Sequence, residues 1–126
     1  MNNEILFFII AFILPHIFYR TILFTKEKFF DKPILREKTG LKIHHMHYGM
    51  IVLLIAITFL LFIEKNIYIT TAMGLGMGLM FDEFIPALLM KSKRKDEMIV
   101  YKKSFLPTLI MFAILIMLLV LLTISL

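Results

Sequence analysis

Residues 44–90 carry the sequence HHMHYGMIVLLIAITFLLFIEKNIYITTAMGLGMGLMFDEFIPALLM, which decides the fold. The stretch holds two continuous apolar runs, separated by the short polar link EKN at 64–66. Each run is near the length of about 20 residues that an α-helix needs to cross a hydrocarbon core. Because so short a link forces consecutive helices to lie antiparallel, the stretch predicts a transmembrane helical hairpin.

Two further apolar runs, at 5–24 and 105–126, flank the hairpin runs at 44–63 and 67–90. With 60% hydrophobic residues and a mean hydropathy of +0.90, this chain of 126 residues carries more apolar surface than a small soluble domain can bury. The runs are continuous and do not alternate, which excludes the strands of a membrane barrel. We therefore expect an all-α bundle of four transmembrane helices. It should form a single multi-pass domain over residues 1–126, in the cell membrane.

The basic residues predict the orientation of this bundle. Twelve of the fourteen Lys and Arg residues lie in the loops at 25–43 and 91–104. Short loops rich in Lys and Arg stay in the cytoplasm, so we expect both termini outside. Arg20 lies one turn inside the cytoplasmic end of its run, where we expect it to snorkel to the headgroups.

Composition also bounds the partners and the source. We expect contacts with the lipid bilayer and, at the two basic loops, with anionic lipids. The Lys and Arg residues form no groove-sized face, so we expect no binding of nucleic acid. A homo-oligomer is possible. The absence of Cys excludes thiolate chemistry. Abundant Ile, Lys, Phe and Met indicate an AT-rich genome and hence a prokaryotic source.

Five ionisable residues lie inside the hairpin runs, where a membrane helix normally has none: His44, His45, His47, Asp82 and Glu83. A charge in hydrocarbon costs a few kcal/mol on insertion scales, so such residues usually pair and often mark a site. At 1.5 Å per residue, the histidines lie up to about 5 Å and the acids about 10–12 Å from the same membrane boundary. We therefore expect one of the histidines at 44–47 to contact Asp82 or Glu83.

The second hairpin run also carries glycines at a spacing that favours close helix packing. Gly74 and Gly78 are four residues apart, and Asp82 continues their stripe. Such stripes let two helix backbones approach closely, and we expect this one to join the two hairpin helices. Pro86 leaves the carbonyl of Asp82 without its helical donor. Asp82 and Glu83 differ by about 100° of helix rotation, so at most one faces any single interface squarely.

Three hypotheses for this polar constellation stay open. Imidazole and carboxylate ligands suit Zn, Fe or Mn, in a membrane-embedded hydrolase or oxidase that acts on a lipid. The candidate ligands are His16, His44, His45, His47 and Asp82, with Glu83 as the general base on a metal-bound water. The second hypothesis is a histidine–carboxylate relay in an ion- or proton-handling transporter or channel subunit. In the third, a structural or assembly subunit, the acids pair with the histidines or Arg20 only to be neutralised.

The hairpin resembles a group of small prokaryotic integral membrane proteins. The shared features are His44-His45 followed by Gly49, and the glycine-rich GLGMGLMFDEF of residues 74–84, which ends in Asp82 and Glu83. These proteins carry a His-His…Gly motif and a glycine-rich Asp-Glu motif on successive transmembrane helices. The resemblance covers residues 43–84 and implies a helical membrane protein, without an activity that can be transferred.

The expected orientation can be tested by labelling. A cysteine introduced at Ser92 should be shielded from an impermeant thiol reagent in intact cells, whereas one introduced at Asn66 should react, because the basic loops are retained in the cytoplasm. The chain has no native Cys, so only the introduced residue reports. Labelling at Ser92 with protection at Asn66 would contradict the orientation.

Overall fold

The protein is described by a computed structural model that covers residues 2–26, 43–89 and 94–125. Within these ranges it contains five helices and no strand: α1 (Asn3–Thr25), α3 (His45–Phe62), α4 (Ile67–Leu89), α5 (Arg94–Lys103) and α6 (Phe105–Ser125). Four of them, α1, α3, α4 and α6, are long and apolar enough to cross a membrane. The all-α class and the four apolar helices are therefore confirmed.

Helix α5 replaces part of what the sequence predicted as a loop. It leads almost directly into α6, because the Ser104 N–H donates to the Val100 carbonyl at 2.8 Å and the Thr108 N–H to the Ser104 carbonyl at 3.0 Å. Pro107 has no N–H to continue this pattern but is tolerated in the first turn of a helix. The basic loop at 27–42, where anionic lipid contacts were expected, lies outside the described residues.

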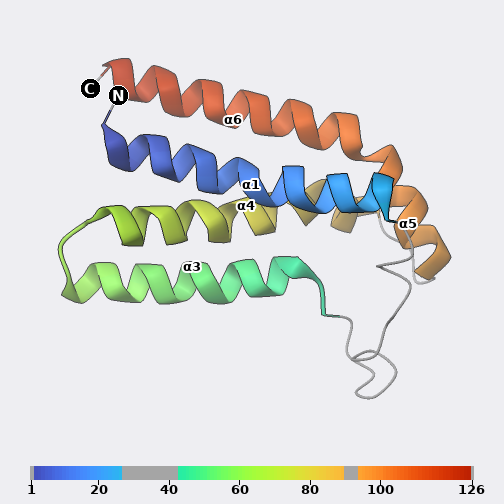
Figure 1. Ribbon diagram of the computed structural model, residues 1–126, viewed down its shortest axis with the longest axis horizontal. Coiled ribbons are helices and arrows are strands. Elements are labelled where there is room, and N and C mark those ends of the chain that lie inside the picture. The colour runs from blue at the N-terminus through green and yellow to red at the C-terminus, as the bar shows by residue number, and fades with distance from the viewer. Residues whose placement is uncertain (1, 27–42, 90–93, 126) are drawn as a thin grey trace.

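Helix α4 lies at the centre of the bundle, with α1 packed on one side and α3 on the other. Helices α3 and α4 run antiparallel, as the short link predicted, and the Asn66 side chain caps α4 by accepting from the Tyr68 and Ile69 N–H groups at 3.0 and 3.1 Å. Helix α6 packs less extensively, against α4 and α1. Figure 1 shows both termini at one end of the bundle and α5 at the other.

Two sets of glycines hold α4 against its two neighbours. A methyl group at Gly74 or Gly78 would meet the backbone of Phe8 or Phe12 in α1. On the other side, a methyl group at Gly76 would lie 2.9 Å from the Gly49 carbonyl oxygen of α3. At these positions only glycine lets the backbones approach this closely.

The stripe of Gly74 and Gly78 was therefore assigned to the wrong neighbour. It packs on α1, whereas the hairpin contact between α3 and α4 uses Gly76 and Gly49. The physical reason is the helix period: positions 74, 78 and 82 share one face, and 76 and 83 share another. The sequence identified the face correctly, but it does not say which helix covers that face.

The glycine packing predicts a specific loss of stability. Replacing Gly78 with Ala should lower the free energy of unfolding by about 1–3 kcal/mol, because an added methyl group forces α1 and α4 apart. Leu88→Ala is the matched control, since Leu88 lies on the same helix and is exposed. Thermal melting of the purified variants in detergent measures both. A Gly78→Ala protein as stable as Leu88→Ala would contradict the close approach.

Candidate functional site

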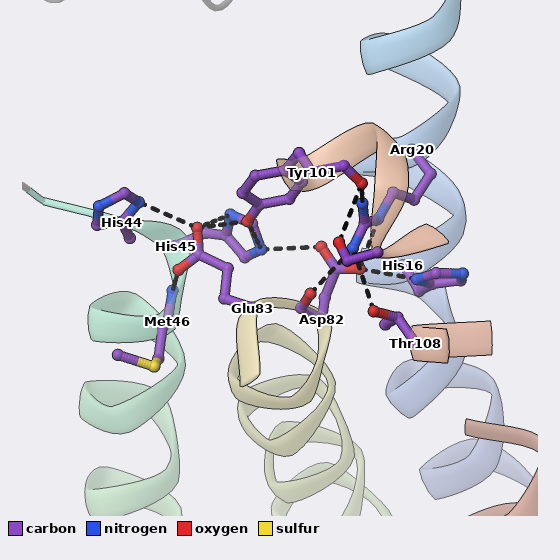
Figure 2. Close-up of polar contacts among 10 residues, drawn as sticks. His16, Arg20, His44, His45, Met46, Asp82, Glu83, Tyr101 and Thr108 are labelled. Carbon is purple, nitrogen blue, oxygen red and sulfur yellow. Dashed lines mark hydrogen bonds and ion pairs between the residues drawn. The ribbon is translucent and has the colours of Figure 1, made fainter. Parts of the chain in front are cut away.

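A buried polar cluster surrounds the last turns of α4, where Asp82 faces α1 and Glu83 faces α3. Asp82 is fully buried and Glu83 is 3% exposed. Figure 2 shows that side chains from α1, α3, α5 and α6 converge on these two carboxylates. The cluster thus joins every described helix of the protein at one end of the bundle.

Asp82 lies between two histidines and an arginine. Its Oδ1 atom is 2.7 Å from Nδ1 of His16 and accepts from Nε of Arg20 at 3.2 Å, both on α1. Its Oδ2 atom is 3.0 Å from Nε2 of His45, the first residue of α3. Both carboxylate oxygens are therefore occupied, and the side chain links α4 to both of its neighbours.

Arg20 is the counter-ion of Asp82 and is itself only 2% exposed. Its Nη2 atom donates to the Asp82 carbonyl at 3.2 Å, the carbonyl that Pro86 leaves without a helical donor. Its other contacts are the Tyr101 carbonyl, the Tyr101 ring at 4.6 Å and the Thr108 hydroxyl at 3.5 Å. The expectation that Arg20 snorkels to the headgroups is wrong, because the buried acceptors around it replace water as its hydrogen-bond partners.

Glu83 binds the beginning of α3 and the end of α5. Its Oε2 atom accepts from the Met46 N–H at 3.0 Å, a first-turn donor of α3 that has no partner within its own helix. Its Oε1 atom accepts from the Tyr101 hydroxyl at 2.5 Å and lies 3.3 and 3.1 Å from the Nδ1 atoms of His44 and His45. A carboxylate at this place is also favoured by the positive end of the α3 dipole.

His45 connects the two carboxylates. Its Nε2 atom lies 3.0 Å from Asp82 and its Nδ1 atom 3.1 Å from Glu83. The ring of Tyr19 stacks on the imidazole, with centroids 4.0 Å apart and planes inclined by 7°. This stacking holds the imidazole plane in place between the two acids, where Nε2 hydrogen-bonds with Asp82.

The expected contact between the histidine run and the acids is confirmed by His44 and His45. His16 also reaches Asp82, across the interface with α1. His47 differs: it is exposed, and its Nδ1 atom accepts from the His44 N–H at 3.1 Å at the start of its own helix. In the described part of the chain, His47 contacts neither acid.

Three residues of the cluster were not predicted as part of the site: Tyr19, Tyr101 and Thr108. Arg20 was expected as a partner of the acids only under the structural hypothesis. Arg20 is four residues after His16, so the helix period puts both on one face, and this spacing was the available signal. Tyr101 lies in the basic segment that was expected to be a loop, so no helical spacing indicated that its side chain would be buried. Burial, followed by the charges of Glu83 and Asp82, raises the pKa of Tyr101 well above its ordinary value. Its hydroxyl therefore stays a neutral hydrogen-bond donor.

The described residues do not test whether the expected metal ion binds. No group of three or more His, Asp or Glu side chains in the described ranges is arranged to hold one. Asp82 accepts from Arg20 on one oxygen, and a cation at that oxygen would have to displace the guanidinium. The expectation of Zn, Fe or Mn stays a prediction.

No known family model matches the sequence, and no curated protein or solved structure is significantly similar to it. The resemblance to small membrane proteins with a His-His…Gly motif and an Asp-Glu motif therefore stays a prediction. What the protein does has to follow from the geometry of the cluster.

The pairing of Arg20 and Asp82 predicts the effect of removing one charge. Asp82→Asn keeps the volume but leaves Arg20 buried without a counter-ion, which should lower the free energy of unfolding by about 3–5 kcal/mol. Glu64→Gln is the control, since Glu64 is an exposed carboxylate in the α3–α4 link. Thermal melting in detergent compares them. Unchanged stability of Asp82→Asn would show that the pair is dispensable.

Proposed function

We propose that this protein handles protons at one membrane face, where the cluster around His45 takes up and releases a proton. Its four apolar helices are compatible with an integral membrane protein. The observation that carries the proposal is the double contact of one imidazole: His45 presents its two ring nitrogens to two different buried carboxylates. The positive-inside rule predicts that this face is cytoplasmic.

The imidazolium form of His45 places a positive charge 3.0 Å from Asp82 and 3.1 Å from Glu83, and it attracts both ionised carboxylates. Its Nε2 atom hydrogen-bonds with Asp82, whereas the contact of Nδ1 with Glu83 is an ion-pair contact. A neutral imidazole loses the charge attraction to both acids. Binding of one proton at His45 therefore changes the electrostatic contacts of Asp82 and Glu83 together.

The charges of the cluster support the same assignment. Asp82 and Glu83 carry two negative charges and Arg20 one positive charge, so a protonated His45 makes the buried cluster neutral. Neutral clusters avoid much of the cost of charge in a low-dielectric interior. Arg20 is buried and permanently charged, and we assign the change of charge to His45 because its imidazole lies against both acids.

The cluster has a route for protons to water through His44. The His44 side chain is 25% exposed, and its Nδ1 atom lies 3.3 Å from the carboxylate of Glu83, which in turn contacts His45. Neighbouring imidazole and carboxylate groups at these distances can pass a proton along the chain. These contacts support exchange of protons between His45 and the water at one face of the membrane.

Two other hypotheses from the sequence are less well supported. As a general base, Glu83 would need a free lone pair towards a substrate, but it already receives the Met46 N–H, the Tyr101 hydroxyl and two imidazoles. A proton path across the whole bilayer finds little support among the described residues in the middle of the bundle. The hydroxyls of Thr58, Thr70 and Thr71 are bonded to carbonyls of their own helices. We therefore propose a proton step at one face only.

The test is to count the protons bound by purified protein in lipid nanodiscs. His45→Gln should bind one proton fewer than the wild type between alkaline and mildly acidic pH, because the bridging group no longer titrates. Met50→Leu is the matched control: Met50 lies on the same helix, is exposed, and its replacement removes no titrating group. Histidine ¹⁵N spectra recorded in parallel show which histidine binds the proton.

The two possible results separate proton handling from scaffolding. If both variants fold and the step is lost only in His45→Gln, the proposal holds. If His45→Gln titrates like the wild type, the cluster is a scaffold and the proposal fails. Metal content measured on the same samples tests the remaining metal prediction.

A further inference from the structure

We infer that Nε2 of His16 binds the hydroxyl group of a small neutral ligand between α1 and α6. Among the residues that the structure describes, this atom is the buried side-chain nitrogen or oxygen without a hydrogen-bond partner. His16 is 4% exposed, so bulk water does not supply the missing partner. Buried polar atoms are rarely left unpaired, and an orphaned one points to a bound group.

The chemistry of this atom follows from the other end of the ring. Nδ1 of His16 lies 2.7 Å from Asp82, an acceptor, and therefore carries the hydrogen. Arg20 already balances Asp82 at the same oxygen, so a second positive charge on His16 has no counter-ion there. The ring is then neutral and Nε2 has a bare lone pair. It requires a hydrogen-bond donor.

The surroundings limit which donor fits. The imidazole stacks on Phe105 and Phe112 of α6, at centroid distances of 5.7 and 5.0 Å. Figure 2 shows the far edge of the His16 ring turned away from Asp82. An ammonium or guanidinium donor would lose its hydration among these rings, whereas a hydroxyl loses far less. Water and the hydroxyl of an amphiphile dissolved in the bilayer share this chemistry.

The site lies beside lipid. Thr108 and Phe112 are the buried residues of α6, and the helix exposes large apolar side chains, such as Leu109, next to them. An amphiphile in the bilayer would therefore lie beside the helix that covers His16. The binding inference does not depend on proton transfer at His45. If that transfer occurs, His16 would be the inner end of the same hydrogen-bonded series, through Asp82.

The experiment reads the Nε2 signal of His16 directly, by solid-state ¹⁵N NMR of the full chain. The protein is reconstituted in phosphatidylcholine–phosphatidylglycerol vesicles, with and without 4-octylphenol. Loss of one signal in His16→Gln assigns it, with His47→Gln as the control that retains it. If His16→Gln does not fold, magnetisation transfer from labelled phenylalanine rings assigns the wild-type signal instead.

A hydrogen-bonded, unprotonated Nε2 should resonate upfield of a free lone pair. Magnetisation transfer from water protons to Nε2 of His16, in the vesicles without 4-octylphenol, identifies water as the ligand. A further shift of the Nε2 signal on adding 4-octylphenol, with magnetisation transfer from the phenol ring, identifies a bilayer amphiphile. A free lone pair under both conditions, or a protonated Nε2, overturns the inference. Neither result bears on the proton count of His45→Gln, so the two proposals fail independently.

Discussion

The buried ion pair of Arg20 and Asp82 is the interaction on which the rest of the structure depends. Each partner is almost fully excluded from solvent, and a single buried charge without its partner would be strongly destabilising. The guanidinium joins α1 to the side chain and carbonyl of α4, to the last turn of α5 and to the first turn of α6. These helix ends therefore take positions that satisfy one arginine.

The helix period explains how α4 serves two neighbours at once. Its face with Gly74, Gly78 and Asp82 packs on α1, and its face with Gly76 and Glu83 packs on α3. Each face has glycine for close approach and one carboxylate at its end. Adjacent acids in the sequence thus serve different interfaces, and His45 is the residue that reconnects them.

Much of this arrangement was predictable from the sequence, because apolar runs, a short link and shared depth act within or between consecutive helices. Those features predicted the four apolar helices, the hairpin and a contact between the histidines at 44–47 and one of the two acids. The predictions that failed were those that depend on which helix packs against a given helix face. The stripe of Gly74 and Gly78 could not name α1 as its partner, and Tyr101 could not be placed without knowing that α5 folds back onto Glu83.

The cap at the beginning of α3 has a consequence for the order of assembly. The N–H of Met46 needs an acceptor that its own helix cannot give, and it finds one in Glu83, near the far end of the next helix. A chain that enters the bilayer from its N-terminus presents α3 before that carboxylate exists there. Until α4 has arrived, water has to satisfy this donor, which holds the beginning of α3 at the membrane surface. Completion of α4 then replaces water with Glu83, so the beginning of one helix is capped only after the next helix is in place.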